Sequence, residues 1–163
     1  VRKQADAELY RRQKEAEAQK YEAERAAEAA KFAKQQEAEG IALVGKAEAL
    51  VKGLGFHFRT VKLAAGDCSF SMARTYDIEV WIPSMGIYKE VSSASNARDY
   101  QARRGNMKYR GEDGKLHFVN TLNASGLATS RVMPAIVEQY QNADGSITVP
   151  EVLRPYMGID VIR

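Results

Sequence analysis

Large apolar residues recur at a fixed interval in the first third of the chain, among small and charged residues. They are spaced by eleven positions each time: Tyr10, Tyr21, Phe32, Leu43 and Leu54. Strong helix formers, chiefly Ala, Glu, Lys, Gln and Arg, fill the intervals, and neither glycine nor proline occurs before Gly40. An eleven-residue period corresponds to about 3.67 residues per turn. The pattern therefore predicts a long helix with a right-handed supercoil.

Two interpretations of this helix remain open. Its dense charge, with pairs such as Glu8 and Arg12 one turn apart, fits a solvated single helix. Its regular repeat favours association side by side with other helices, because a strict period has no use in an isolated helix. Gly40, Gly45, Gly53 and Gly55 interrupt the pattern, so we expect the helix to fray or turn between Gly40 and Gly55.

After these glycines the pattern alternates with the period of a β-strand. Residues 56–63, 75–82 and 87–91 read as strands, and the second and third are joined by a turn at residues 83–86. A short helix is expected at 97–104, and a further strand at 115–122. The connections are of hairpin length, and an amphipathic helix follows. This order predicts the α+β class, with an antiparallel sheet backed by a helix.

The stretch from Thr121 to Tyr140 leads from a strand directly into that helix. Asn123 and Ser125 offer an amide and a hydroxyl, and Gly126 would let a ligand approach the backbone. Exposed N–H groups at a helix start favour anions, and we expect Arg131 to point toward the same place. An isolated pattern of this kind also fits an ordinary helix start with a surface arginine.

Charge and composition narrow the classes of protein. Residues 1–50 hold 10 Lys or Arg and 10 Asp or Glu, and the remainder holds 14 and 11, so the net charge is only +3. That balance does not by itself indicate nucleic-acid binding. The single cysteine, Cys68, excludes an internal disulfide framework. No run is long and apolar enough for a membrane span, and no signal peptide is recognised, which predicts a cytoplasmic protein; Val1 suggests a fragment.

The amino-acid sequence of the N-terminal repeat resembles the coiled-coil region of the flotillins over about residues 1–46. The segments that carry the resemblance are ADAELYRRQKEAEAQKYEAE and QEAEGI. Flotillins are membrane-scaffold proteins whose helices assemble side by side, so the resemblance implies coiled-coil self-association. The membrane-binding part of that family lies upstream of this region, and membrane attachment is not implied.

Residues 47–163 resemble the C-terminal part of the catalytic domain of seryl-tRNA synthetase, a class II enzyme. Four motifs carry the resemblance in the family's order: TYDIEVW, EVSSASNARDYQARR, LNASGLATSR and VPEVLRPYMG. The third corresponds to motif 3 of the class. Small departures occur at Ala94, where the family often has cysteine, and at Ala124 and Ser130, where glycine is frequent. The resemblance implies a partial class II sheet.

The same resemblance implies roles for individual residues. Glu90 and Ser93 would hold the Mg²⁺ that accompanies ATP, Asn123 and Ser125 would line the serine pocket, and Arg131 would contact the γ-phosphate. Taken singly, Glu90 also fits an exposed cross-strand partner and Ser93 a turn residue. His57 and His117 are expected to be strand residues and not metal ligands, because no second His, Cys or paired carboxylate lies near either in sequence.

Two functions follow, from different classes. The first is a partial seryl-tRNA synthetase module, which in the family adenylates serine with ATP and transfers it to tRNA. Motifs 1 and 2 and the helical arm that holds tRNA are not found here, so we expect the chain to be inactive alone. The second is a flotillin-like coiled-coil scaffold or an engineered fusion without activity. Because no single family joins both parts, the chain is interpreted as a chimera of domains 1–46 and 47–163.

Overall fold

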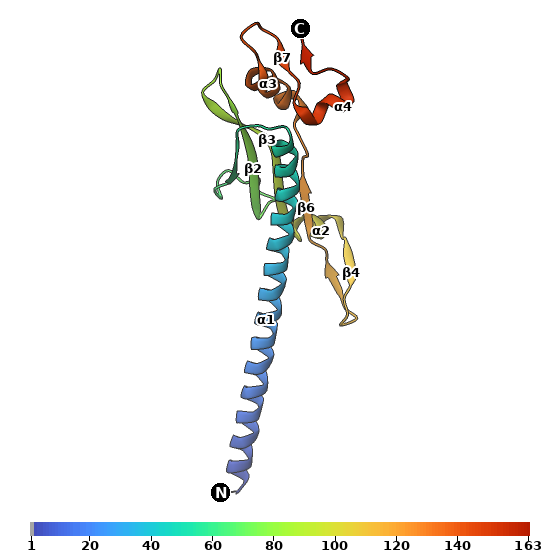
Figure 1. Ribbon diagram of the computed structural model, residues 1–163. Coiled ribbons are helices and arrows are strands. Elements are labelled where there is room, and N and C mark those ends of the chain that lie inside the picture. Colours follow the sequence, from blue (N-terminus) through green and yellow to red (C-terminus); the bar gives the residue numbers. More distant parts are fainter. Residues whose placement is uncertain (1) are drawn as a thin grey trace. The chain divides into compact units, whose positions relative to one another are not determined.

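The computed structural model describes the backbone of residues 2–163 and the side chains from residue 8 onward (Figure 1). The chain divides into two compact units, residues 1–38 and 39–163. Helix α1 (Arg2–Gly53) provides all the secondary structure of the first unit and the beginning of the second. Among the described residues, no helix combines the length and apolar composition that a membrane span requires.

Exposed ion pairs run along α1 in the first unit. Arg12 Nη2 lies 3.1 Å from Glu8 Oε1, which confirms the predicted pairing, and Arg11 Nε lies 3.1 Å from Glu15 Oε1. The repeat's large side chains are also exposed: Tyr10 by 62%, Tyr21 by 61% and Phe32 by 43%. The long helix is thus confirmed, whereas the right-handed supercoil concerns associated helices and stays a prediction.

The C-terminal end of α1 packs into the second unit. Val44, Ala47, Val51 and Leu54 are buried at helical spacing. The helix passes through Gly40 and Gly45 and ends at Gly53, followed by a turn at Leu54 and Gly55, which confirms an end between Gly40 and Gly55. Each helical glycine costs about 1 kcal/mol, but burying each large apolar side chain returns about 1.5–3 kcal/mol. Tertiary packing therefore holds the helix through these glycines.

A four-stranded antiparallel sheet forms the centre of the second unit. Its strands are β1 (Phe58–Lys62), β2 (Arg74–Ile82), β3 (Ile87–Arg98) and β6 (Thr121–Ala124), in the order β1-β2-β3-β6. Helix α3 (Thr129–Tyr140) packs against β2 and β3. The predicted α+β class, with an antiparallel sheet backed by a helix, is confirmed.

The hydrophobic core lies between this sheet and the two helices. Ile78, Val80 and Ile82 alternate along β2 and are buried. They share one cluster with Val132 and Ala135 of α3 and with the buried end of α1. Tyr140 Oη donates a hydrogen bond to the carbonyl oxygen of Leu54 at 2.5 Å, so the end of α3 is fastened to the end of α1.

Smaller elements surround the sheet. They are α2 (Tyr100–Gly105), the hairpin β4 (Lys108–Arg110) with β5 (Leu116–Phe118), the pair β7 (Ile147–Thr148) with β8 (Val161–Ile162), the 3₁₀ turn η1 (Glu151–Leu153) and α4 (Arg154–Met157).

Several boundaries differ from the sequence prediction. Strand β1 begins at Phe58, so His57 precedes the strand in which it was expected. The strand expected at 115–122 is divided between β5 and β6, which pair with different partners. The third strand reaches Arg98, well past residue 91, because β6 pairs with its second half. For the same reason the helix expected at 97–104 begins at Tyr100.

Candidate active site

The face of the sheet opposite the core carries charged residues. Asp77 and Glu79 alternate with the buried Ile78 and Val80, so their side chains point away from the core. On the neighbouring strand, Ser93 lies opposite Asp77 and Glu90 lies opposite Glu79. Oxygen-bearing side chains of two strands therefore meet on this face.

A β-bulge places Glu90 and Ser93 together. They are three positions apart, so a regular strand would point them to opposite faces. The register shifts between Ile78, which pairs with Ser92, and Glu79, which pairs with Glu90. Val91 is the extra residue and is fully buried. The bulge turns Glu90 to the face of Ser93, and the two predicted metal ligands share one surface.

Two arginines compensate the carboxylates. Glu79 and Glu90 lie directly opposite each other, an arrangement that destabilises a sheet when both are charged. Arg59 Nε lies 2.7 Å from Glu79 Oε2, and Arg131 Nη1 lies 3.0 Å from Glu90 Oε2. Arg131 Nη1 also donates to the backbone oxygen of Glu90 at 2.9 Å. The Arg131 and Glu90 side chains remain 51% and 40% exposed, so a ligand can reach both.

The connection from β6 to α3 is fastened to β3 by hydrogen bonds. Ser125 Oγ accepts a bond from the Ser93 N–H at 3.0 Å, and the Ser125 N–H donates to the Ser93 oxygen at 3.0 Å. Ala128 N–H donates to the Val91 oxygen at 2.6 Å. The start of α3 is thereby held beside the bulge, which explains how Arg131, in its first turn, reaches Glu90.

Two residues of the corner between β6 and α3 (residues 121–131) differ in their surroundings. Asn123 pairs with Ser95 across the strands, its side chain is exposed, and Nδ2 lies 3.9 Å from Met72 Sδ. Its amide is therefore available to a ligand. A Cβ added to Gly126 would lie 3.5 Å from Leu50 Cδ1, so this glycine faces α1. Gly126 is nevertheless exposed, and the approach of a ligand to its backbone stays a prediction.

An open cavity of about 550 Å³ lies over the charged face and the first turns of α3. It is lined by residues of both: Asp77, Glu79, Ile82, Met85, Tyr88, Lys89, Glu90, Ser130, Arg131, Pro134 and Glu138. Glu90 and Arg131 are the two predicted site residues in this lining. Ser93 adjoins it through Asp77, whereas Asn123 and Ser125 lie beside it, along β6 and the connection to α3.

Sequence reasoning missed Asp77 and Glu79 as site residues. Their alternation with Ile78 and Val80 carried the signal, because it assigns them to the face away from the core. Burial raises the pKa of the Asp77 carboxyl; a hydrogen bond from Ser93 opposes this, and the charges of Glu90 and Glu79 add to it. The described residues contain no cluster of three or more His, Cys, Asp or Glu that could hold a metal. A cation here would need oxygen atoms from its ligand as well.

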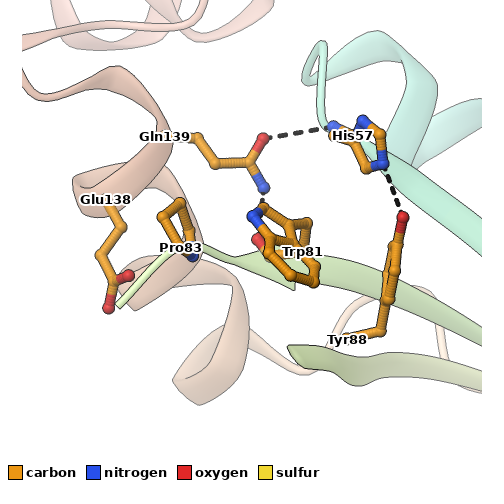
Figure 2. Close-up of a pocket in the computed structure, with 6 residues that line it drawn as sticks. All are labelled: His57, Trp81, Pro83, Tyr88, Glu138 and Gln139. Atoms are coloured by element: carbon orange, nitrogen blue, oxygen red, sulfur yellow. Dashed lines mark hydrogen bonds between the residues drawn. The ribbon is translucent and has the colours of Figure 1, made fainter. Parts of the chain in front are cut away.

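A second recess, of about 530 Å³, adjoins this cavity through Tyr88 and Glu138 (Figure 2). Figure 2 shows Gln139 between His57 and Trp81: its Oε1 accepts the His57 N–H at 3.2 Å, and its Nε2 donates to the Trp81 oxygen at 2.7 Å. His57 Nε2 lies 2.6 Å from Tyr88 Oη. The polar atoms of this recess largely satisfy one another, so we interpret it as structural.

Comparison with known proteins assigns the family. A family model of the tRNA synthetase class II core domain (G, H, P, S and T) matches residues 18–140. The chain belongs to this class II family. Over 119 residues it is 73% identical to serine–tRNA ligase 2 of Clostridium acetobutylicum, a match that covers 72% of this chain. It is 59% identical to serine–tRNA ligase of Fervidobacterium nodosum over 121 residues, or 74% of this chain.

Solved structures agree with this class II assignment. Seryl-tRNA synthetase from Pyrococcus horikoshii, complexed with ATP, is 41% identical, with a TM-score of 0.72 over 76% of this chain and 28% of that one. The fold is therefore a partial class II synthetase fold. The chain spans about 28% of the length of the two curated ligases.

Proposed function

We propose that this chain forms the motif 3 side of a seryl-tRNA ligase active site, which binds ATP and serine. The observation that carries the proposal is the contact between Arg131 and Glu90 in the cavity lining. A guanidinium held beside exposed carboxylates on a rigid sheet is suited to a nucleotide phosphate accompanied by a cation. The similarity to serine–tRNA ligases supports serine as the amino acid.

Arg131 is the proposed phosphate ligand. Its ion pair with Glu90 is exposed, and exposed ion pairs contribute little to stability, about 0–1 kcal/mol. A phosphate group can therefore replace the Glu90 carboxylate as a partner of the guanidinium at a small cost in free energy. The hydrogen bond to the backbone oxygen of Glu90 holds the side chain in place, and the planar guanidinium can bind two phosphate oxygens at once.

Glu90 and Ser93 are the proposed Mg²⁺ ligands. The bulge gives a carboxylate and a hydroxyl on one face, and Mg²⁺ is usually held by one or two carboxylates together with substrate phosphates and water. The donor set therefore fits the ion. When bound, it would neutralise the negative charge of the triphosphate, while Asn123 and Ser125 orient serine at the neighbouring corner.

The proposed reaction has two steps. A carboxylate oxygen of serine attacks the α-phosphorus of ATP, which forms seryl-adenylate and releases pyrophosphate. A ribose hydroxyl at the 3′ end of tRNA then attacks the seryl carbonyl carbon and AMP leaves. In the family, motifs 1 and 2 also serve these steps, so we expect the 163 residues alone to bind ligand with little or no turnover.

Calorimetric titration with a non-hydrolysable seryl-adenylate analogue in magnesium buffer tests this proposal. Saturable binding at one site per chain is the expected result. Absence of heat at two temperatures would reject a formed site, because the binding enthalpy cannot vanish at both when the heat capacity changes on burial.

A second candidate function is self-association through α1, as the flotillin-like interpretation of residues 1–46 implies. The observation that favours it is the exposure of Tyr10, Tyr21 and Phe32 at eleven-residue spacing. Light-scattering mass across a hundredfold range of concentration would test it. We expect the mass of the wild type to rise with concentration. At the same concentration, a Tyr10→Ser, Tyr21→Ser, Phe32→Ser variant should have a smaller mass. A constant monomer mass would reject self-association. The interpretation of the chain as a chimera stays a prediction.

A further inference from the structure

The positive charge of the chain is concentrated in one segment, residues 98–118, which contains α2 and the β4–β5 hairpin. Six Lys or Arg residues stand there against three acidic ones, an excess of +3, equal to the net charge of the whole chain. The six cationic residues are Arg98, Arg103, Arg104, Lys108, Arg110 and Lys115. The remainder of the chain is therefore neutral on balance.

The hairpin places two of these cations, Lys108 and Arg110, on one face. Lys108 lies opposite Phe118 and Arg110 opposite Leu116, so these four side chains share a face. Tyr109 and His117 form the pair on the other face. There, His117 Nε2 lies 3.0 Å from Asp113 Oδ1, so one of the two acidic residues of the turn, Asp113, is engaged away from Lys108 and Arg110.

Phe118 organises the basic face. Lys108 Nζ lies 4.8 Å from its ring centroid, and Arg103 Cζ lies 5.2 Å from the same centroid. Both distances are within the range of cation–π contacts. The ring is covered by cations and is not free to stack on a nucleobase, so the face is suited to contact a charged backbone and not to read bases.

These cations remain accessible. Lys108, Arg104 and Arg110 are exposed. Arg110 Nη1 donates to the Gly114 oxygen at 2.7 Å, and Arg103 is paired with Asp99 at 2.6 Å. Within the described part of the chain, neither Lys108 nor Arg110 forms an ion pair with a carboxylate. Two positive charges are thus left without an acidic partner on the same side.

We propose that this basic face, formed by Lys108 and Arg110 beside Phe118, binds the sugar-phosphate backbone of RNA. The identity of the RNA as the acceptor substrate rests on the proposed function. Strand β5 leads into β6, and Phe118 and Asn123 are five residues apart, about 17 Å in extended chain. An RNA strand held on the hairpin can therefore extend to the corner where serine is proposed to bind.

Fluorescence anisotropy with a labelled tRNA transcript tests the inference, with the full 163-residue chain between 50 and 200 mM salt. The test variant is Lys108→Gln with Arg110→Gln, the two cations that share the face. The control, Lys46→Gln with Lys62→Gln, removes the same charge from exposed positions elsewhere in the second unit. Circular dichroism confirms that all three proteins are folded.

We expect the wild type and the control to bind RNA with the same salt dependence. Each lost phosphate contact lowers the slope of log K against log salt by about 0.7–0.9. The affinity ratio of wild type to test variant should therefore fall roughly 7- to 12-fold from 50 to 200 mM salt. Unlabelled RNA of unrelated sequence should compete, because the contacts are to the backbone.

Four results would overturn the inference: no binding at 50 mM salt, equal slopes for test and control variants, displacement of the RNA by poly-L-glutamate as readily as by RNA, or strict preference for one sequence. Titration of the same variants with the seryl-adenylate analogue separates this inference from the proposed function. If the wild type binds the analogue but not RNA, the RNA face alone is defeated; if it binds RNA but not the analogue, the nucleotide site alone is defeated.

Discussion

Arg131 and Glu90, 41 positions apart in sequence, are joined twice: Nη1 lies 3.0 Å from Oε2 and donates to the Glu90 backbone oxygen at 2.9 Å. The contact links the first turn of α3 to the bulged strand β3. The backbone bond fixes the position of the guanidinium, while a phosphate group can replace the Glu90 carboxylate as its partner. This pair is therefore the centre of the proposed nucleotide site.

Glu90→Gln should weaken the effect of magnesium on nucleotide binding. The variant loses the carboxylate proposed as a Mg²⁺ ligand but keeps the backbone oxygen that holds Arg131. We expect ATP to bind the wild type more tightly in magnesium than in EDTA, and this advantage to shrink about tenfold or more in the variant. Calorimetry in both buffers measures it, with Glu8→Gln on α1 as control. An undiminished magnesium effect would remove Glu90 from the metal site.

Asn123→Ala and Ser125→Ala should separate binding from stability. Asn123 is exposed and its side chain makes a weak contact with Met72, so its replacement should change the free energy of unfolding by less than about 0.5 kcal/mol. Ser125 Oγ accepts the Ser93 N–H, and its loss should cost about 1–3 kcal/mol. Urea unfolding and analogue titration together measure both. Equal destabilisation by the two variants would contradict the assignment.

Asp77→Asn should stabilise the protein at neutral pH. Because folding raises the pKa of Asp77, its favourable contribution is fully present below the unfolded value of 3.8 and is lost as pH rises through the folded value. The asparagine variant escapes that loss. Its free energy of unfolding should exceed that of the wild type at pH 7, and the difference should disappear as pH falls toward 3.8. Urea unfolding at several pH values tests this; a variant less stable at pH 7 would contradict it.

Gln139→Ala should destabilise the second unit without direct loss of ligand contacts. Gln139 links α3 to β2 through the Trp81 oxygen and to the segment before β1 through the His57 N–H (Figure 2). Breaking both bonds should cost about 1–3 kcal/mol. Thermal unfolding measures the change, with the exposed Gln13→Ala on α1 as control. A change no larger than that of the control would show that the link is weak.

The elements with clear periodicity could be predicted from sequence, and the contacts between them could not. Alternation along TYDIEVWI identified β2, although the position of Asp77 and Glu79 on the face away from the core was not drawn from it. Strand β4 was missed because its three residues are all exposed and show no pattern. The passage of α1 through Gly40 and Gly45 depends on burial against the sheet, which local propensity does not contain.

The candidate site was predicted residue by residue from a resemblance, and its geometry needed the structure. Spacing alone would place Glu90 and Ser93 on opposite faces, and only the bulge at Val91 brings them together. Ser125 has a structural role, as acceptor of the Ser93 N–H, that its position in the corner did not indicate. The basic face was not predicted either. The net charge of +3 for the whole chain does not show that the excess lies in residues 98–118 and that the remainder is neutral.

The central claim is that Arg131 binds a phosphate group of the nucleotide. The most direct measurement is titration of the seryl-adenylate analogue and of ATP, in magnesium buffer, into wild type, Arg131→Gln and Arg12→Gln. Arg12 forms a comparable ion pair with Glu8 on α1, outside the site. Loss of a charge-assisted bond costs about 1.5–3 kcal/mol, so ATP affinity should fall roughly 10- to 100-fold in Arg131→Gln and stay unchanged in Arg12→Gln. Equal ATP affinity in all three proteins would contradict the account.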